Sequence, residues 1–498
     1  MLLLHQFTYF IVIFGYIETG KCSGSKTMIT NNGLNDVYGK NPGLKSRITS
    51  NGLNYANKVA MDALTANIRT FIVPDQHGDS SGVQYDLTNL RVTGFTEPQS
   101  SISFLPGGLK WTANGAGVSM HGNYRYKIHK KWLPTIRGSG TFDISVFGLD
   151  FSINMVFGVD VNGRPTIEAR GCSCGIYRVK IKFHGGWAWL YNLFSRILES
   201  KVRKILMHKI CDIVTKQINE DMEKKLASLP VTTILGERFL LDYRLLQIPD
   251  FHSSYMETFH KGEIYWFGDE REAPLDPPTM ADIGDTQKMM YFWISDYMFN
   301  TLGYAAQMHD YLIRNITAAD LPPDQRGILN TTCTSFLCFG NLIPQLQKIF
   351  PNNTVELNLF SGSPPTMIIS PGQLTVGCSG KIMLYARQKD NSLAYVMTTV
   401  ATMETSVNVS VSNELVHGEI NDITLLLNVT DSAVGPINSM FLQVLTNSVI
   451  RAVLIPKINE FGKKGFPLPV TGKIRFINTS LRLLQNSMVI ETDLNYTS

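Results

Sequence analysis

The stretch Phe142-Asp-Ile-Ser-Val-Phe-Gly-Leu-Asp-Phe-Ser-Ile-Asn-Met-Val-Phe-Gly-Val-Asp-Val161 decides the fold. Apolar residues occupy alternate positions from Phe142 to Val146, and the alternation resumes at Leu149 after a one-residue change of phase. A period of two places alternate side chains on opposite faces of a sheet, so the pattern predicts long strands with one buried face. The phase change at Gly148 predicts a bulge or a turn. Similar alternation, punctuated by Gly, extends over about residues 83–185.

Helical patterns lie on both sides of this strand-rich region. Ser50 precedes a pattern with Leu53, Ala56, Ala60, Leu64 and Ile68 on one face, which stops before Pro74. From about residue 187 to 226, apolar residues recur every four positions, which predicts a helix of roughly 60 Å. A helix of that length must lie along an elongated body built from strands.

The second half of the chain repeats this order of elements. We expect an aromatic helix over about 285–314, strands over roughly 330–430, and a long helix over about 437–462 with a kink at Pro456. Both long helices end in Leu-Pro-Val-Thr, at residues 229–232 and 468–471. The sequence therefore predicts two copies of one unit, joined by a Pro-containing linker near 231–280.

Charge divides the chain into two unequal parts. The net charge of the 498 residues is +4, but residues 21–230 carry +12 and residues 231–498 carry −7. The 44% hydrophobic content excludes disorder as the main state. A basic first half suggests that this half meets an anionic partner.

The N-terminus and the glycosylation motifs both predict secretion. Residues 2–17 contain no charged side chain and precede a polar stretch, which indicates a signal peptide cleaved near Gly20 or Cys22; an uncleaved anchor is the alternative. The motif N-x-[ST] occurs seven times, always beyond residue 300, and predicts a glycan-covered second half. The predicted sites are Asn315, Asn330, Asn352, Asn408, Asn428, Asn478 and Asn495.

Four segments, in order along the chain, resemble the family of bactericidal/permeability-increasing protein and lipopolysaccharide-binding protein. They are residues 41–56 (NPGLKSRITSNGLNYA), 186–194 (GWAWLYNLF), 294–301 (ISDYMFNT) and 464–469 (KGFPLP). The resemblance implies an α+β fold. It would be a boomerang of two similar domains, each a twisted antiparallel barrel with a long wrapping helix, joined by a central sheet.

On this basis we expect a signal peptide at 1–20 and an N-terminal barrel domain at 21–230 that binds lipid and lipopolysaccharide. A linker with central-sheet strands at 231–280, a C-terminal barrel domain at 281–470 and a return to the central sheet at 471–498 would follow.

The implied function is that of a secreted, non-enzymatic lipid-binding protein in innate antibacterial defence. It would hold phospholipid in an apolar pocket of each domain and bind lipopolysaccharide through the basic tip of the first. Displacing divalent cations from the bacterial outer membrane would follow. The expected partners are lipopolysaccharide, phospholipid, the outer-membrane surface and a host receptor contacted through the C-terminal domain. Phospholipid would be a ligand; no cofactor, metal or nucleic acid is expected.

The segment from Tyr124 to Trp132 lies between strand-like runs and matches the family's lipopolysaccharide-contacting hairpin. Cations there suit phosphates, and aromatic residues suit the boundary between the polar and apolar parts of a lipid. The predicted contacts are Arg69, Arg125, Lys127, Lys130, Lys131, Trp132 and Arg137. The alternative is an ordinary solvated hairpin. Residues 71–82 depart from the bactericidal members, because they contain two Asp and no Lys.

The resemblance also implies a Cys172–Cys211 disulfide between a strand and the long helix. Spacing alone leaves Cys174 as a competing partner, and Cys333, Cys338 and Cys378 would form one bridge and leave one thiol. Leu190, Phe194 and Leu198, at the start of the long helix, are candidates for an acyl-chain pocket.

Two other functions compete with lipopolysaccharide binding. A lipid-transfer protein would use the same pockets to carry phospholipid or neutral lipid. An enzyme is remote: residues 171–175 (GCSCG) match the nucleophile-elbow motif of hydrolases, but another strand follows where that motif needs a helix. His121, His129 and His208 are scattered and are not expected to bind a metal.

Overall fold

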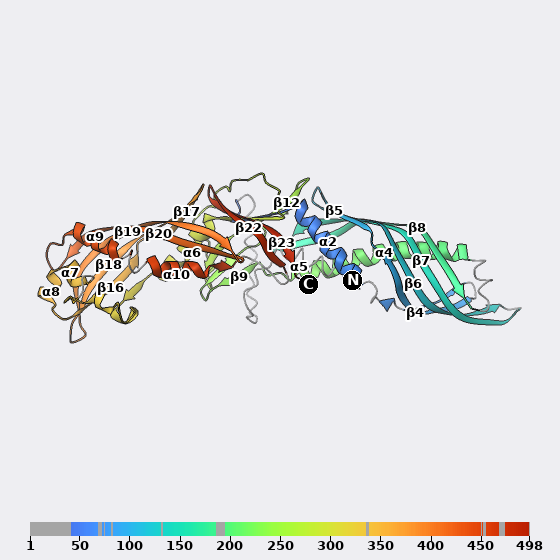
Figure 1. Ribbon diagram of the computed structural model, residues 1–498, viewed down its shortest axis with the longest axis horizontal. Helices are drawn as coiled ribbons and strands as arrows, with labels where there is room; N and C mark the ends of the chain where they lie inside the picture. Colours follow the sequence, from blue (N-terminus) through green and yellow to red (C-terminus); the bar gives the residue numbers. More distant parts are fainter. Residues whose placement is uncertain are drawn as a thin grey trace.

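The computed structural model describes residues 41–67, 72–73, 75–80, 83–130, 133–185, 195–334, 338–449, 451, 455–467 and 474–497. Within them the molecule is elongated, with a strand-rich lobe at each end and a central sheet between the lobes (Figure 1). We call the part from β2 to α5 the N-lobe and the part from β15 to β21 the C-lobe. The predicted signal peptide lies outside the described residues and stays a prediction.

The N-lobe is one curled antiparallel sheet. Its strands follow the order β2-β4-β6-β7-β8, with β3 paired to β4 and β5 paired to β6. They are β2 (Ile72–Val73), β3 (Gln76–Ser80), β4 (Val83–Thr96), β5 (Gln99–Leu105), β6 (Gly108–Lys130), β7 (Leu133–Val159) and β8 (Pro165–His184). The stretch quoted first lies mostly on β7, which confirms the predicted long strands.

The alternation of buried and exposed side chains changes phase at Gly148 on β7, and we call this position the Gly148 seam. Phe142, Ile144 and Val146 are buried before it and Phe151, Ile153 and Met155 after it, because one extra residue resets the alternation. The pairing of β6 with β7 is irregular at this point, and Gly148 has a φ of +59°, which glycine adopts without strain. The bulge alternative is confirmed, and the same face of β7 lines the core along the whole lobe.

A long helix runs along the outermost strand, β8. It consists of α4 (Ser195–Lys216), a π-helical turn η2 (Gln217–Met222) and α5 (Glu223–Ala227). Three of its side chains accept hydrogen bonds from backbone N–H groups of β8: Glu199 from Ile181 (3.0 Å), Asn219 from Ala169 (2.8 Å) and Glu223 from Ile167 (2.6 Å). Helix side chains thus take the place of the neighbouring strand that β8 lacks at its unpaired edge.

The apolar face of this helix fills the lobe. Ile218, Met222 and Leu226 are fully buried, and Ile210 and Val214 pack against the same core. Residues four apart drift by about 40° per repeat around an α-helix, so a strict four-residue pattern rotates away from one face. The π-helical turn is wider and restores Ile218 and Met222 to the core. The predicted helix is confirmed over residues 195–226; residues 186–194 lie outside the described residues.

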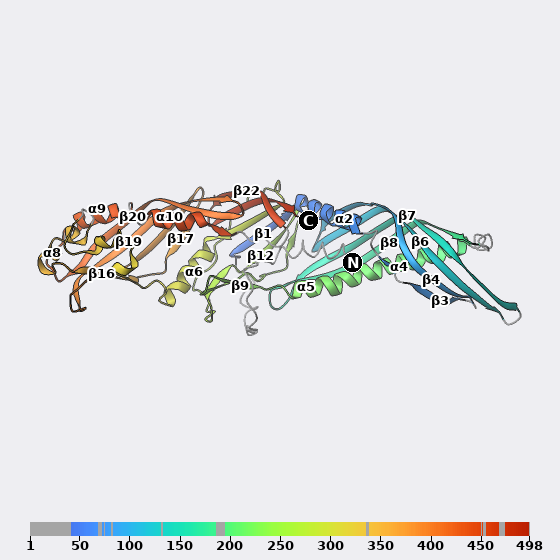
Figure 2. The ribbon, with the colours of Figure 1, turned by 60° about the horizontal axis from the view of Figure 1, so that its bottom comes forward.

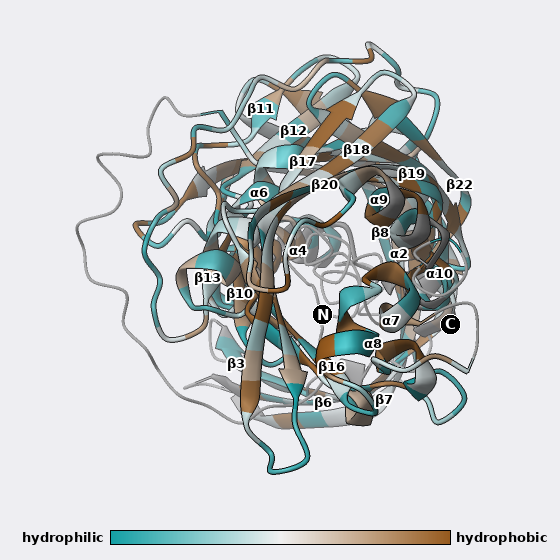
Figure 3. Ribbon diagram, turned by 90° about the vertical axis from the view of Figure 1, so that its left-hand side faces the viewer, coloured by the Kyte–Doolittle hydropathy of each residue, from teal (hydrophilic) through white to brown (hydrophobic). Residues whose placement is uncertain are grey.

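The C-lobe is a second curled sheet, in the order β15-β16-β18-β19-β20-β21 with β17 paired to β18. Its strands are β15 (Arg314–Ile316), β16 (Thr354–Ser361), β17 (Thr366–Ser370), β18 (Gln373–Arg387), β19 (Leu393–Ser412), β20 (Leu415–Ser432) and β21 (Phe466–Pro467). The strands expected from about 330 therefore begin later, since residues 339–349 form α7 (Phe339–Leu342) and α8 (Gln345–Ile349). Figure 3 looks along the molecule at this lobe, where α7, α8 and α9 share a core with β16, β18 and β19.

Two helices, α9 (Ser439–Val449) and α10 (Ile455–Lys464), occupy the range predicted as one kinked helix. Pro456 lies in the first turn of α10, where a missing N–H costs nothing. Gln443 of α9 accepts a hydrogen bond from Leu427 N (2.7 Å), and Asn459 of α10 exchanges two bonds of 2.8 Å with the backbone of Ile420. The C-lobe helices therefore cover the edge of β20 as the long helix covers β8.

The central sheet joins segments from the start, middle and end of the chain (Figure 2). Its order is β11 (Asp250–Phe251), β12 (Tyr255–His260), β1 (Leu44–Thr49), β14 (Met290–Ser295), β23 (Ser487–Tyr496) and β22 (Ile474–Leu484). A small sheet of β13 (Glu263–Trp266), β10 (Phe239–Asp242) and β9 (Thr232–Leu235) lies beside α6 (Asp296–Met308). The helix expected over 285–314 was wrong at both ends. Met290–Ser295 is a strand that pairs with β1 and β23, and α6 ends at Met308. Ser295 caps α6 by accepting from Tyr297 N (3.2 Å).

The predicted first helix is confirmed as α2 (Ser50–Asn67), with Leu53, Ala56 and Ala60 buried. Just before it, Arg47 of β1 is fully buried between the rings of Tyr255 and Trp293. Its guanidinium lies 2.7 Å from a carboxylate oxygen of Glu257 and 2.6 Å from one of Asp282. A buried cation needs such partners, so Arg47 ties the segment around Asp282 to the central sheet.

The observed architecture confirms the predicted α+β class: two similar lobes, each a curled antiparallel sheet with helices along its edge, joined by a central sheet. The residue bounds given above for the domains stay predictions. Among the described residues, no helix is long and apolar enough to cross a membrane.

We expect Glu223→Ala to destabilise the fold by about 1–2 kcal/mol, because it leaves the N–H of Ile167 without its acceptor. Glu223→Gln keeps an acceptor and should cost less than half as much. Urea unfolding followed by circular dichroism measures both. Glu220→Ala, an exposed residue three positions earlier, is the matched control and should change stability by under about 0.5 kcal/mol; equal effects of Glu220→Ala and Glu223→Ala would contradict the edge-capping role.

Candidate functional site

The predicted basic hairpin exists and lies at the free end of the N-lobe (Figure 2). It is formed by β6 and β7, in which Lys127 pairs with Arg137 and Arg125 pairs with Ser139. Because paired residues share a face, Arg125, Lys127 and Arg137 all project from the outer side of the sheet. We call these three residues the tip cations.

The inner side of the same hairpin is aromatic. Tyr124 is buried, its ring stacks near that of Tyr126 (6.3 Å between centroids), and both belong to the core of the lobe end. Gly138 pairs with Tyr126, and a Cβ at Gly138 would collide with that ring. The alternation thus sends aromatic rings inward and the tip cations outward.

The tip cations make no ion pair with any described residue. The nearby carboxylates have other partners: Asp86 lies 2.6 Å from His77 Nδ1, and Asp143 lies 2.7 Å from His121 and 2.8 Å from His184. The hydrogen bond from His121, followed by that from His184, holds the pKa of Asp143 below its ordinary value. The charge of the tip cations is therefore available to an external anion.

Sequence reasoning overlooked a second set of cations on β8. Arg178, Lys180 and Lys182 are exposed and alternate with Val179, Ile181 and Phe183, which face the core. We call Arg178, Lys180 and Lys182 the β8 strip. The signal was present in the sequence as a strict alternation of basic and apolar residues.

A narrow apolar pocket lies where the N-lobe meets the central sheet. It is lined by Phe157, Gly163, Pro165, Leu229, Pro230, Val231, Tyr243, Leu245, Pro249, Met256, Thr258 and His260. Two of its polar side chains bond to protein groups: His260 Nδ1 lies 2.8 Å from the Tyr243 carbonyl oxygen, and Thr258 Oγ1 lies 2.8 Å from His260 Nε2 and 2.6 Å from Ser46 Oγ. The pocket wall offered to a ligand is therefore apolar.

Comparison with known proteins places the chain in a family. The model of the LBP / BPI / CETP family N-terminal domain matches residues 52–225, and that of the C-terminal domain matches residues 233–496. The chain belongs to the LBP / BPI / CETP family. Members of this family bind lipids and are not enzymes.

Two relatives and one solved structure illustrate the similarity. Bactericidal permeability-increasing protein of Sebastes schlegelii is 30% identical, covering 92% of this chain and 96% of that protein. Human lipopolysaccharide-binding protein is 29% identical, covering 93% and 95%. A crystal structure of lipopolysaccharide binding protein superposes with a TM-score of 0.59 at 28% identity, covering 92% of this chain and all of that one.

The predicted contact residues fall into two groups. Arg125, Lys127 and Arg137 come together at the tip, whereas Arg69, Lys131 and Trp132 lie outside the described residues. The same is true of Leu190 and Phe194 and of the side chains of Lys130 and Leu198. The GCSCG motif lies inside β8, which pairs antiparallel with β7 and continues as a strand beyond the motif, so the strand–turn–helix context of a nucleophile elbow is absent there. No cluster of metal-ligating side chains occurs among the described residues.

The disulfide that the family resemblance implied is present. Cys172 on β8 bonds to Cys211 on α4, with Cα atoms 5.8 Å apart, and Cys174 is free. In the C-lobe, Cys333 bonds to Cys338 and Cys378 is free, so the prediction of one bridge and one thiol is confirmed. The first bridge fixes the long helix to β8 between the hydrogen bonds of Glu199 and Asn219.

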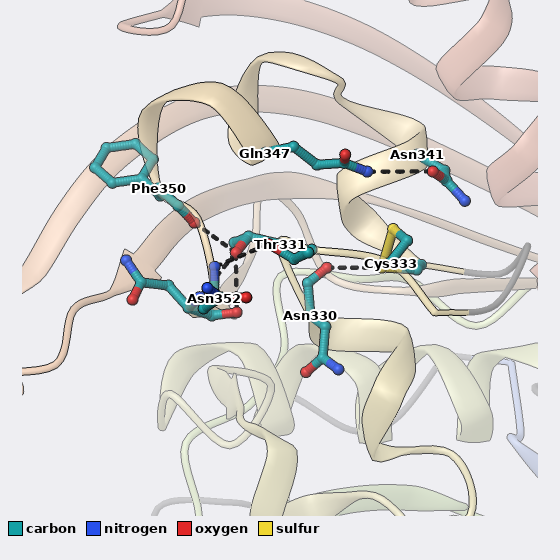
Figure 4. The surroundings of a disulfide bond; sticks show 10 residues. Asn330, Thr331, Cys333, Asn341, Gln347, Phe350 and Asn352 are labelled. Carbon is teal, nitrogen blue, oxygen red and sulfur yellow. Dashed lines mark hydrogen bonds between the residues drawn. A yellow bond between two sulfur atoms is a disulfide. The ribbon is translucent and has the colours of Figure 1, made fainter.

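Two predicted glycosylation sites meet beside the Cys333–Cys338 bridge (Figure 4). The hydroxyl of buried Thr331 donates to the Phe350 carbonyl at 2.5 Å, and Asn353 N donates to the Thr331 oxygen at 2.9 Å. Asn330 is half-buried, while the six other predicted sites are exposed: Asn315, Asn352, Asn408, Asn428, Asn478 and Asn495. Their exposure is compatible with glycans at these six positions.

We expect the stability of the protein to fall between about pH 6.5 and 4 through His260. Its Nδ1–H donates to the Tyr243 carbonyl, and in the neutral ring Nε2 accepts from the Thr258 hydroxyl, so both ring nitrogens are satisfied without a buried charge. Burial lowers the pKa of His260 to about 4, although the Tyr243 carbonyl opposes this. Between these pH values the unfolded chain therefore binds a proton that the folded chain does not bind. This lowers the free energy of unfolding by roughly 3 kcal/mol across the window.

The measurement is the urea midpoint of the wild type and of His260→Gln from about pH 7.5 to 4. His260→Gln should be less stable at neutral pH but should show a shallower loss on acidification. Parallel pH profiles would show that His260 does not carry this dependence.

Proposed function

We propose that this protein is a secreted lipid-binding protein that binds bacterial lipopolysaccharide through the tip of its N-lobe. The observation that carries the proposal is the set of tip cations, which project from the end of the lobe without an ion-pair partner among the described residues. Arg125 and Arg137 can each hold a phosphate oxygen pair, and Lys127 adds a point charge between them. Lipid A phosphates are ligands of this chemistry.

The acyl chains of the ligand would supply most of the affinity, at ~0.8 kcal/mol per buried CH₂, while the cations select anionic head groups. The apolar lining of the narrow pocket between Phe157, Leu245 and Met256 suits a segment of an acyl chain, and this chemistry is the basis for proposing a phospholipid ligand there. A phospholipid held there would be a ligand in a non-enzymatic protein. Competition of the tip cations with divalent cations on the outer membrane would give an antibacterial effect.

A carboxylate on β3, near the tip cations, should weaken lipopolysaccharide binding. Strand β3 lies next to β4 at the tip, and its exposed Asp79 pairs with Gln84, which in turn pairs with Lys127. The carboxylate of Asp79 thus lies two strands from a tip cation. We therefore expect weaker affinity than in relatives with a lysine-rich segment at this position.

A lipid-transfer function is the second candidate, and the position of the pocket favours it. The pocket lies at the junction of the N-lobe and the central sheet, away from the tip cations, and so could take up a neutral lipid without them. Secretion, glycosylation and contact of the C-lobe with a host receptor complete the proposal.

We expect Arg125→Gln/Lys127→Gln/Arg137→Gln to weaken lipopolysaccharide binding about 10- to 100-fold at low salt, since each cation near an anionic surface contributes about 1 kcal/mol. Titration against lipopolysaccharide and against phosphatidylcholine vesicles, at low and high salt, measures this. Lys348→Gln/Lys381→Gln/Lys389→Gln removes the same charge from exposed C-lobe positions and should have little effect. Equal binding to neutral vesicles by wild type and tip variant would favour lipid transfer instead.

Secreted protein from eukaryotic cells should lose mass on treatment with peptide N-glycosidase, and peptide mapping should find the glycans on the exposed sites of the C-lobe and central sheet. Asn408→Gln and Asn428→Gln, both on outward-facing strand positions, should each remove one glycan. An unchanged mass would refute glycosylation.

A further inference from the structure

The outer face of the N-lobe sheet is strongly cationic beyond the tip. On β3, β4, β6, β7 and β8, between the tip and the Gly148 seam, the described outward positions include seven cations and three carboxylates. The cations are the tip cations, the β8 strip and Arg91; the carboxylates are Asp79, Asp86 and Asp143. The excess of positive charge is concentrated at the tip and on β8.

The β8 strip forms the part farthest from the tip. Residues two apart on a strand are separated by ~6.5–7 Å, so Arg178, Lys180 and Lys182 place three charges in a line on one face. Their cross-strand neighbours on β7 are Phe147, Ser145 and Asp143, and Asp143 is already engaged by two histidines. Within the described residues, none of the three cations makes an ion pair.

Two exposed aromatic residues lie at the seam end of the strip. Tyr177 precedes Arg178 and is 82% exposed, and Phe147 pairs with Arg178 and is 47% exposed. Aromatic side chains with an apolar body suit the boundary between lipid head groups and acyl chains. Cations bordered by exposed aromatic rings are characteristic of surfaces that lie against membranes.

The shape of the face indicates which anion it meets. Arg178, Lys180 and Lys182 are all exposed and stand in a row on one strand, so they present three separate charges and do not converge on a single phosphate. A line of exposed cations on a broad sheet face instead complements an extended array of negative charges.

We propose that the outer face of β7 and β8 docks on the surface of an anionic phospholipid bilayer, with the β8 strip against the phosphates and Tyr177 and Phe147 at the head-group boundary. This goes beyond lipopolysaccharide binding at the tip, because it concerns the cations of β8 in place of the tip cations, and a different ligand. Docking through this face lays the N-lobe along the membrane and brings the tip cations to the same surface.

The test measures binding to large vesicles of phosphatidylglycerol and phosphatidylcholine, without lipopolysaccharide, by co-sedimentation at about 50 and 300 mM salt. Arg178→Gln/Lys180→Gln/Lys182→Gln should weaken binding at low salt by about 10- to 100-fold. The wild-type affinity should fall at high salt, where charges are screened within a few ångströms. Lys348→Gln/Lys381→Gln/Lys389→Gln is the control of equal charge. Thermal unfolding confirms that both variants fold.

Loss of vesicle binding in the β8 variant alone, with lipopolysaccharide binding at the tip retained, supports the proposal. An unchanged β8 variant overturns it, and so does equal weakening by the control, which would indicate net charge alone. Retention of the wild type on heparin that is lost in the β8 variant, with vesicle binding unchanged, would assign the face to a sulfated polysaccharide and also overturn the proposal. Failure of the tip variant to affect lipopolysaccharide binding bears only on the function proposed above.

Discussion

Both lobes depend on one arrangement, in which helix side chains supply hydrogen-bond partners to the open edge of a curled sheet. An edge strand presents unpaired N–H and C=O groups, which would otherwise pair with another chain or with water. On β8 these donors are met by Glu199, Asn219 and Glu223, and the Cys172–Cys211 bridge holds the helix between them. On β20 the same task falls to Gln443 and Asn459. The helix thereby closes the sheet and fills its interior at once.

This closure explains why charge and apolar lining occur on the same strands. With the helix on the inner side, the outer face of β6, β7 and β8 is left uncovered and is free to carry Arg125, Lys180 and Lys182. The alternate positions, such as Tyr124 and Ile181, must then be apolar because they meet the helix and the core. A cationic outer surface and an apolar interior are therefore two consequences of one alternation, and a lipid needs both.

Patterns among residues close in sequence correctly predicted the elements whose formation depends on those neighbouring residues. The phase change at Gly148, the four-residue repeat of the long helix and the start of α2 at Ser50 are each set by neighbouring residues, and the structure agrees with them. The strand Met290–Ser295 was missed because its partners lie far away in sequence, at Leu44–Ile48 and Ser487–Thr492. The β8 strip was overlooked for a different reason: the predicted lipopolysaccharide contacts were placed around the hairpin of residues 124–132, although the alternation over 178–183 already placed three cations on one face.

The apolar pocket shows most clearly why a binding site of this kind escapes sequence analysis. Its wall combines Phe157 from the end of β7, Leu229 from beyond the long helix, Leu245 from the linker and Met256 and His260 from the central sheet. The same core cluster contains residues of the N-lobe and of the central sheet, including Ile153, Met222, Met290 and Ile490. The pocket therefore lies in neither lobe alone but at the junction between the N-lobe and the central sheet. No spacing motif can mark such a site, because its residues come from separate segments between Phe157 and His260 that meet only when the N-lobe packs against the central sheet.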